Sequence, residues 1–283
     1  MRIKKLAPAK INLYLEVGEK TDNFHKIVSL VEIISLYDEI YFSPSHDVKV
    51  EFIPDYGIPQ ENTVTKAVSL LKEKFCIKKG IDIKIFKNIP PASGLGGGSS
   101  NAACVLEALC EIWDIDLEEN ELYKLGAEIG SDVPLFLYGK RCVVEGRGEK
   151  ITPLDFKSTL WYFILTPPFP VSTHLVYNYY DKMGLKGDLT KAKEEIKILI
   201  EFMKEGNIKM MENIIYNKLG EVSEGIWKEI KEFRIYMEKK TGKKFFISGS
   251  GGAIFSVFKE KPEEILLAPG ESKWKSFLVK SLN

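Results

Sequence analysis

The segment from Ile89 to Leu109, IPPASGLGGGSSNAACVLEAL, places four glycines within five positions, between a strand-like run and a helix-like run. Glycine costs backbone entropy on folding, and an ordinary turn needs far fewer of them. A helix N-terminus offers unpaired N–H groups and the positive end of the helix dipole, and bare backbone lets an anion approach both closely. The segment therefore predicts a phosphate-binding loop, in preference to a flexible turn capped by a serine.

Two common phosphate-binding motifs do not fit this loop. A P-loop needs a Lys before its final Ser or Thr, and no Lys lies between Gly94 and Ser100. The fingerprint of dinucleotide-binding Rossmann folds would need its third glycine at Ser99. The loop thus predicts a phosphate site of a different kind, in which the hydroxyls of Ser99 and Ser100 can donate to phosphate or contact a metal ion.

Charge and cysteine content exclude several classes of partner. The 283 residues carry 40 basic and 40 acidic side chains, a balance that gives no electrostatic footprint for nucleic acid or an anionic membrane. We expect no signal peptide and no membrane-spanning helix, because no long uncharged apolar run occurs. The four cysteines form no CxxC pair and the three histidines lack metal-ligand spacing. These features predict reduced thiols, a cytoplasmic protein and no dedicated metal ligand.

Hydrophobic periodicity predicts strand runs followed by helix runs, which is typical of an α+β fold. Residues Lys10 to Val17 alternate between polar and apolar, which predicts a half-buried strand. A helix capped by Asn62 or Thr63 is expected before the glycine loop. In the second half we expect three helices, over residues 191–204, 208–219 and 222–240. A strand pair around a glycine turn is expected over 244–258, and a short acidic segment followed by a last strand over 259–282.

Three stretches of the chain resemble the three motifs of a known superfamily, and they occur in the same order along the sequence. PPASGLGGGSSNAA resembles the phosphate loop of the GHMP kinases, which include galactokinase, homoserine kinase and mevalonate kinase. PAKINLYLEV, from Pro8 to Val17, resembles their N-terminal motif, and SGSGGAIFSVF, from Ser248 to Phe258, resembles their C-terminal glycine motif. The resemblance implies a two-lobe GHMP kinase fold, with an N-terminal ribosomal-protein-S5-like lobe at 1–155 and a C-terminal ferredoxin-like lobe at 156–283.

Within that superfamily, FHKIVSLVEIISLYDEI, IGSDVPLFLYG and GRGE resemble the kinases that phosphorylate the 2-hydroxyl of 4-diphosphocytidyl-2-C-methyl-D-erythritol in non-mevalonate isoprenoid precursor biosynthesis. This resemblance implies ATP and Mg²⁺ as cofactors, a cytidine diphospho-polyol as acceptor, and a monomer or weak homodimer. Two positions depart from the pattern of that family. Phe24 stands where Tyr is usual, and Gly252 stands where Ser, Thr or Cys is usual.

The resemblance assigns catalytic roles to Lys10 and Asp132. Lys10 would lie beside the acceptor hydroxyl, stabilise its developing negative charge and lower its pKa. Asp132 would accept the hydroxyl proton, or would act mainly as a charge that orients Mg²⁺–ATP. Without the resemblance, Lys10 is interpreted as a solvated strand residue, and Asp132 as the cap of a helix begun by Pro134.

The resemblance also implies two sets of binding residues. The nucleotide set is Asn62, Pro91, Gly94, Leu95, Gly96, Gly97, Gly98, Ser99 and Ser100, although Asn62 could be only a helix cap. The acceptor set is Asn12, Phe24, His25, Thr173, Tyr177, Gly249, Ser250 and Gly251. Phe24 and Tyr177 would stack on the two faces of the cytosine, and His25 would read its polar edge. Lone aromatic residues are, however, more often part of a core.

Three alternatives stay open on the sequence alone. Another GHMP kinase, acting on homoserine, mevalonate or a sugar, would have no base to stack, so the FH and VSTHLVY stretches disfavour it. A non-catalytic sensor with the same fold would not need Lys10 and Asp132. A glycine-rich binding module without ATP chemistry would not need this acid–lysine pair either.

Overall fold

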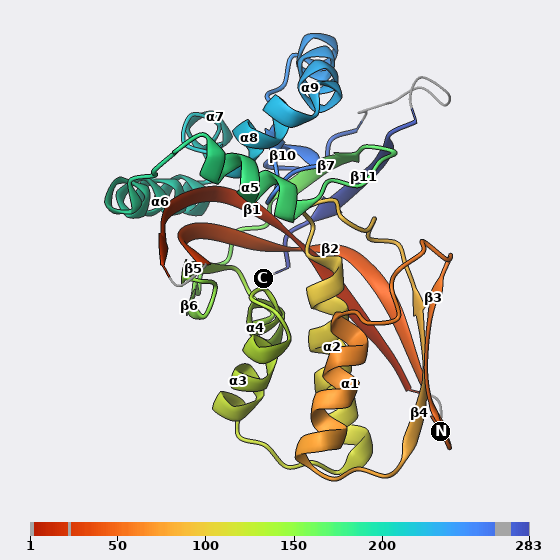
Figure 1. The fold of residues 1–283 in the computed structure, drawn as a ribbon. Helices are drawn as coiled ribbons and strands as arrows, with labels where there is room; N and C mark the ends of the chain where they lie inside the picture. The colour runs from red at the N-terminus through yellow and green to blue at the C-terminus, as the bar shows by residue number, and fades with distance from the viewer. Residues whose placement is uncertain (1–2, 22–23, 264–272, 283) are drawn as a thin grey trace. The chain divides into compact units, whose positions relative to one another are not determined.

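The computed structural model describes residues 3–21, 24–263 and 273–282 (Figure 1). The chain forms two compact units that are not continuous in sequence. Unit 1 contains Met1–Ala9, Leu36–Pro91 and Gly96–Gly139, and unit 2 contains Lys10–Ser35, Ala92–Leu95 and Lys140–Asn283. The predicted lobes at 1–155 and 156–283 stay a prediction.

Unit 1 combines strands with four helices. The strands are β3 (Val48–Ile53), β4 (Gly80–Phe86), the start of β1 (Ile3–Thr21) and the end of β2 (Phe24–Ser45). The helices are α1 (Thr63–Lys74), α2 (Gly97–Trp113), α3 (Glu119–Ile129) and α4 (Val133–Tyr138). Strand β4 pairs with β3 in parallel and with β2 antiparallel, and the helices lie together on one side of these strands (Figure 1). Helix α2 packs against the other three helices.

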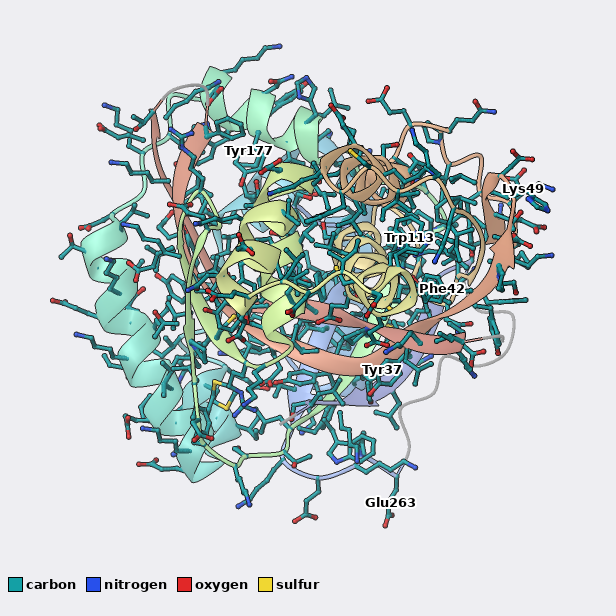
Figure 2. All side chains as sticks on the ribbon, turned by 90° about the horizontal axis from the view of Figure 1, so that it is seen from below. Tyr37, Phe42, Lys49, Trp113, Tyr177 and Glu263 are labelled. Carbon is teal, nitrogen blue, oxygen red and sulfur yellow. The ribbon has the colours of Figure 1, made fainter. Side chains whose placement is uncertain are left out.

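The interior of unit 1 follows the predicted apolar stripes. Phe42 and Trp113 lie among packed side chains, whereas Lys49 extends outward at the edge (Figure 2). The helix expected after residue 62 is confirmed. Asn62 is its N-cap, because its side chain accepts from the backbone N–H groups of Val64 and Thr65. The helix therefore starts where the sequence places a capping side chain.

Unit 2 contains an antiparallel sheet and further strand pairs. The sheet has the order β11 (Lys275–Lys280), β7 (Trp161–Thr166), β10 (Ile254–Phe258) and β9 (Phe246–Ile247). The predicted strand pair around a glycine turn is confirmed as β9 and β10. The acidic segment expected before β11 lies largely outside the described residues. The start of β2 pairs with β5 (Cys142–Gly146), β5 pairs with β6 (Lys150–Pro153), and β1 pairs with β8 (Tyr216–Asn217).

Two of the helices predicted in the second half are wrong in their bounds. The helices are α5 (Thr173–Lys182), α6 (Leu189–Glu205), α7 (Ile208–Met211), α8 (Lys218–Ile226) and α9 (Lys228–Thr241). The helix expected over 208–219 ends early, because Tyr216 pairs in parallel with Tyr14 of β1. The helix expected over 222–240 is broken at Trp227, whose backbone is extended. No helix in the described part of the chain is long and apolar enough to cross a membrane.

The strand from Lys10 to Val17 is buried on both faces, so the expectation of a half-buried strand is wrong. Its polar residues Lys10 and Asn12 are only 5% and 6% exposed. Burial is tolerated because partners satisfy the polar groups, as when the Asn12 side-chain amide donates to the Ser29 hydroxyl at 2.8 Å. The polar face of this strand is therefore part of an ordered interior network.

Glu32 of β2 and Arg141, which directly precedes β5, form a buried ion pair in unit 2. The Nε of Arg141 donates to both carboxylate oxygens of Glu32, at 3.0 and 2.9 Å. The guanidinium also donates to the carbonyl oxygens of Phe156 and Ser158. Burial raises the pKa of Glu32 to about 7, while the guanidinium opposes the rise. Glu32 is thus a carboxyl whose charge depends on its partner.

We expect Arg141→Met to destabilise the protein more at pH 8.5 than at pH 5. The folded-state pKa of Glu32 lies above the ordinary pKa of a glutamate, which is about 4.5. The free energy of unfolding therefore falls as the pH rises from that ordinary pKa to the folded-state pKa. Without Arg141 that pKa rises further, and the loss continues above pH 7. At high pH the free energy of unfolding should fall by about 3 kcal/mol or more. Urea unfolding at both pH values measures this, and an equal loss at both would contradict it.

Candidate active site

The glycine loop leads directly into helix α2, as the sequence predicts. Gly96 is the N-cap of α2, in the left-handed conformation with φ of 72°, and Gly94 is also left-handed with φ of 79°. Such backbone favours glycine. Among the described side chains none caps this helix, so its first N–H groups can serve an anion.

Ser100 provides an observation in favour of a bound phosphate. Its side-chain oxygen is buried and has no hydrogen-bond partner among the described residues. A buried hydroxyl without a partner is rare in native proteins and indicates a missing ligand, water or ion. The loop therefore fits the phosphate groups of ATP. Hydroxyl and phosphate oxygens are also ligands that suit Mg²⁺.

Gly98→Val is expected to weaken ATP binding while the fold survives. A Cβ at Gly98 would meet only the Thr63 hydroxyl at 3.6 Å, which is ordinary contact, whereas one at Gly97 would meet Ile89 at 2.9 Å. The added side chain would keep phosphate away from the exposed backbone, so the Kd of a non-hydrolysable ATP analogue should rise about ten-fold or more. Calorimetry measures this, with Gly225→Ala in α8 as control. An unchanged Kd in folded Gly98→Val would refute the phosphate-loop assignment.

Asp132 lies where the sequence predicts, at the N-terminus of α4 in unit 1. Its side chain is half-buried and makes no hydrogen bond that caps the helix, and its backbone is helical with φ of −89° and ψ of −4°. The interpretation of Asp132 as a simple side-chain cap is therefore not supported by the contacts. Its catalytic role stays a prediction.

Lys10 joins the N-terminal motif to the glycine loop within unit 2. Its Nζ donates to the side-chain oxygen of Asn12 at 2.6 Å and to the carbonyl oxygen of Gly94 at 2.9 Å. Its backbone N–H donates to the carbonyl oxygen of Leu95 at 3.0 Å. Four residues predicted from separate motifs thus lie together, with a buried cation at their centre.

The C-terminal glycine motif contacts the same group. The Ser248 hydroxyl donates to the carbonyl oxygen of Gly94 at 3.1 Å and accepts from the backbone N–H of Asn12 at 3.2 Å. Gly249 is left-handed with φ of 57°, and a Cβ there would lie 3.1 Å from the Nζ of Lys10. The left-handed backbone and the 2.9 Å that would separate such a Cβ from the carbonyl oxygen of Gly94 both favour glycine at this position.

Two residues that hold this motif were not predicted as site residues. The Asn217 side-chain amide donates to the carbonyl oxygens of Ile247 and Gly249, at 2.7 and 2.8 Å. Ser248 lies inside the motif, so its hydroxyl was a visible signal. Asn217 precedes the motif by some 30 residues in an expected helix, and nothing in the sequence links it to the loop.

The remaining predicted acceptor residues of this region are also close to one another. The side-chain oxygens of Thr173 and Ser250 lie 2.7 Å apart and form a hydrogen bond. Gly251 is left-handed with φ of 105°, and a Cβ there would lie 2.3 Å from the Ser223 hydroxyl. The Ser223 oxygen is buried without a hydrogen-bond partner among the described residues. Hydroxyl groups from three segments of unit 2, those of Thr173, Ser223 and Ser250, therefore lie at this turn.

His25 and Tyr177 lie together, with stacked rings whose centroids are 5.5 Å apart. The Nδ1 of His25 lies 3.0 Å from the carbonyl oxygen of Gly18, and its Nε2 lies 2.7 Å from a carboxylate oxygen of Asp181. Since a carbonyl oxygen only accepts, the Nδ1 carries a proton. Asp181 was not predicted, and it fixes the orientation of the imidazole.

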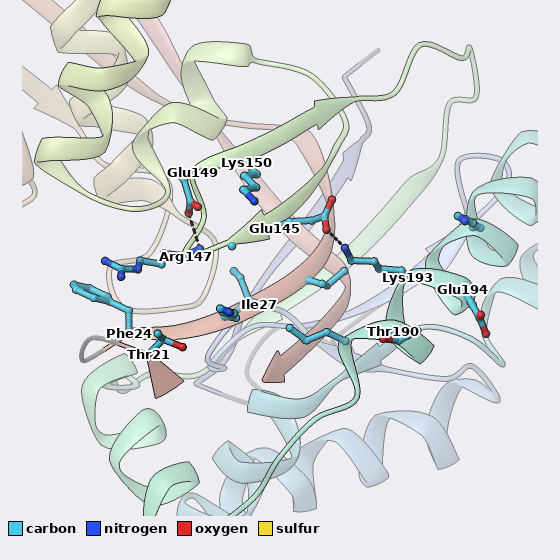
Figure 3. A pocket seen from close by; sticks show the side chains of 15 residues that line it. Thr21, Phe24, Ile27, Glu145, Arg147, Glu149, Lys150, Thr190, Lys193 and Glu194 are labelled. Carbon is cyan, nitrogen blue, oxygen red and sulfur yellow. Dashed lines mark hydrogen bonds and ion pairs between the residues drawn. The ribbon is translucent and has the colours of Figure 1, made fainter. Parts of the chain in front are cut away.

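Phe24 is placed differently from the expectation for a base-stacking pair. It precedes His25 on β2, so its side chain lies on the opposite face of the strand. The ring is about half exposed and lies 5.2 Å from the guanidinium carbon of Arg147, in a pocket of about 510 Å³ (Figure 3). The stacking of cytosine between Phe24 and Tyr177 stays a prediction.

Comparison with known proteins places this arrangement in a family. Residues 62–140 match the family described as GHMP kinases N terminal domain. The chain is 36% identical over 273 residues to a 4-diphosphocytidyl-2-C-methyl-D-erythritol kinase of Clostridioides difficile, covering 93% of this chain and 89% of that protein. A protein of the same name from Thermodesulfovibrio yellowstonii is 34% identical, covering 90% and 89%.

Similarity to solved structures supports the same family. A 4-(cytidine 5'-diphospho)-2C-methyl-D-erythritol kinase has a TM-score of 0.74 at 31% identity, covering 92% of this chain and 91% of that chain. A homoserine kinase from Cytophaga hutchinsonii has a TM-score of 0.70 at 18% identity, covering 99% and 94%, which bears on the fold alone. The predicted two-lobe α+β GHMP kinase fold is therefore confirmed. The chain belongs to the 4-diphosphocytidyl-2-C-methyl-D-erythritol kinase family of GHMP kinases.

Proposed function

We propose that this protein transfers the γ-phosphoryl group of ATP to the 2-hydroxyl of 4-diphosphocytidyl-2-C-methyl-D-erythritol. One observation carries the catalytic part of the proposal. The buried ammonium of Lys10 donates to the carbonyl oxygen of Gly94 in the glycine loop, and this contact supports a role for the cation in phosphoryl transfer. The names of the relatives supply the acceptor.

The nucleotide half of the site is the glycine loop and the first turn of α2. Backbone N–H groups from Gly96 onward would bind phosphate oxygens, aided by the helix dipole. The orphaned hydroxyl of Ser100 and the neighbouring hydroxyl of Ser99 are the candidates to reach a phosphate or its metal. Mg²⁺, when bound, neutralises charge on the phosphates.

The chemical step needs positioning and charge stabilisation more than covalent chemistry. The acceptor oxygen forms a bond to the γ-phosphorus as the bond to the leaving ADP oxygen breaks. Lys10 stabilises negative charge developing on the acceptor oxygen, and burial strengthens that effect because water does not screen it. Asp132 accepts the hydroxyl proton, or acts as a charge that orients Mg²⁺–ATP.

In this proposal, polar groups of unit 2 would line the acceptor half of the site. Thr173 and Ser250 would offer hydroxyl groups, and the backbone of Asn12 contacts the Ser248 hydroxyl of the C-terminal glycine motif. His25 and Tyr177 form a ring pair against which a pyrimidine can stack. These features favour an acceptor with a base over homoserine, mevalonate or a simple sugar.

Tyr177→Leu tests the cytidine part of the proposal. Loss of one stacking face, worth ~1–3 kcal/mol in nucleic-acid complexes, should raise the acceptor KM about ten-fold. The KM for ATP should stay unchanged, because Tyr177 stacks on His25, which belongs to the proposed acceptor half of the site. Steady-state kinetics with each substrate varied in turn measures both constants. Tyr179→Leu, on an exposed ring of the same helix, is the control, and equal effects of the two changes would contradict a base site at Tyr177.

The proposed reaction has a direct chemical test. The pure protein is incubated with ATP, Mg²⁺ and the cytidyl acceptor, and phosphorus NMR follows the products. We expect one new phosphomonoester signal, while the diphosphate bridge of the acceptor stays intact. ATP hydrolysis without that signal would contradict the proposed acceptor.

We also place the protein in the cytoplasm, as part of the same proposal. All four cysteines are free thiols, which suits a reducing compartment. ATP and a cytidine diphospho-polyol are the proposed partners. A monomer or weak homodimer stays a prediction.

A further inference from the structure

Three buried side chains of unit 1 form a closed network beneath the glycine loop. Asp38, in the second half of β2, pairs with Lys87, which follows β4, and the two side chains are 0% and 3% exposed. The Nζ of Lys87 also donates to the side-chain oxygen of Asn101 in α2 at 3.0 Å. The side-chain amide of Asn101 donates back to Asp38 at 2.8 Å. Each member therefore contacts both others.

The carboxylate of Asp38 is fully engaged by this network and the adjoining backbone. One oxygen accepts from Lys87 and Asn101. The other accepts from the backbone N–H groups of Asn88 and Ile89, at 2.8 and 2.9 Å. The network thus holds the end of β4, the chain that enters the glycine loop and the first turns of α2.

The network reaches the loop itself at Gly97. A Cβ at Gly97 would lie 3.2 Å from the Nζ of Lys87, so the ammonium lies directly against the backbone of the first residue of α2. Asn101 lies one turn further along α2, next to Ser100 with its orphaned hydroxyl. The Asn62-capped helix adds a separate tie, because the Thr63 hydroxyl donates to the carbonyl oxygen of Gly98 at 2.9 Å.

Stability alone does not account for charges at this position. A buried ion pair loses the hydration of both ions, and replacing such a pair by apolar side chains is often neutral or stabilising. Burial accordingly lowers the pKa of Lys87, against the opposing effect of Asp38. The ion pair and Asn101 instead provide hydrogen bonds of fixed direction between β2, the end of β4 and α2.

We propose that Asp38, Lys87 and Asn101 are positioning residues that fix the glycine loop and the first turn of α2 in the conformation that binds the phosphates of ATP. The proposal rests on the nucleotide half of the proposed function and is independent of the acceptor. The side chains act through the backbone of Gly97 and through Ser100, and none of the three is assigned contact with ATP.

The test compares a single change that removes one contact with a double change that removes both charges of the pair. Asn101→Ala removes the tie to α2 and leaves the ion pair in place. The double change Asp38→Asn/Lys87→Met removes both charges, so neither is left buried alone, and its melting temperature should lie near that of the wild type. Calorimetry measures the Kd of a non-hydrolysable ATP analogue, and thermal unfolding measures the fold.

A matched control is available in unit 2. The double change Glu32→Gln/Arg141→Met removes a buried ion pair of the same kind, which joins β2 to the backbone at Phe156 and Ser158. Because the contacts described for this pair are with Tyr162, Phe156 and Ser158, the Kd of the analogue should stay within about two-fold of the wild type.

We expect the Kd of the analogue to rise about ten-fold or more in both unit 1 variants, since a small misplacement of binding groups is costly. The rise should persist in the double variant although its melting temperature is near normal. A wild-type Kd in that folded double variant, or an equal rise in the unit 2 control, would overturn the proposal. If the wild type bound the analogue but did not phosphorylate the cytidyl acceptor, the acceptor assignment would fail and the positioning proposal would stand on the binding data.

Discussion

Asp132→Asn is expected to lower kcat by about 10²- to 10⁴-fold, the range for loss of a positioned general base or acid. The melting temperature should stay near that of the wild type, because the Asp132 side chain makes no hydrogen bond that caps α4. The change keeps the size of the side chain and removes only its charge. Steady-state kinetics and thermal unfolding measure the two effects.

The kinetic pattern also separates the two roles considered for Asp132. A proton acceptor predicts a lower kcat with little change in the KM for ATP, whereas a charge that orients Mg²⁺–ATP predicts that both constants change. Glu118→Gln is a matched control, because Glu118 also precedes a helix without capping it through its side chain. Turnover at the wild-type level in folded Asp132→Asn would remove Asp132 from the mechanism.

Lys10→Met should lower kcat by about 10²- to 10³-fold, the loss typical of removing one group that stabilises charge in the transition state. The ammonium is buried and held by Asn12 and Gly94, so water cannot replace it without rearrangement. The KM values should change less than kcat, because the charge acts mainly on the oxygen that becomes negative during transfer. Initial rates under saturating substrates measure the effect.

Lys5→Met is the control for the lysine. Lys5 lies on the same strand, but its partner is the surface carboxylate of Glu111 at 2.7 Å, and exposed pairs contribute little. Near-normal turnover is expected there. If Lys10→Met kept wild-type turnover in a folded protein, the chain would be better described as a kinase with another charge-stabilising group, and the assignment of Lys10 would be wrong.

The parts of the site that the sequence predicted are those encoded by local patterns. The glycine run and the apolar stripe after it place a glycine loop at the start of α2, which the structure confirms. Asn62 followed by helical spacing places the start of α1, and the glycines after Ile247 place the turn between β9 and β10. In each case the signal and the structure lie within a few residues of each other, so periodicity and glycine content were sufficient.

The parts that were missed depend on partners distant in the chain. The polar face of β1 becomes buried because Gly94, Ser29 and Ser248 satisfy Lys10 and Asn12, and alternation alone predicts a solvated face. Strand β8 exists because Tyr216 pairs with Tyr14, which overrides the helical pattern.

The aromatic site shows a further limit of pattern reading. Phe24 and Tyr177 were predicted as a pair from the resemblance, whereas the structure pairs Tyr177 with His25 and places Phe24 beside Arg147. Adjacent residues of a strand lie on opposite faces, and the stacking of Phe24 and Tyr177 on a cytosine stays a prediction.

The most direct test of the proposed function is an acceptor screen with the pure protein, ATP and Mg²⁺. ADP release is measured with 4-diphosphocytidyl-2-C-methyl-D-erythritol, homoserine, mevalonate and galactose in parallel. We expect sustained ADP release with the cytidyl acceptor, and only background release with the other three. Release with homoserine, mevalonate or galactose but not with the cytidyl acceptor, or background release with all four, would contradict the function proposed for this chain.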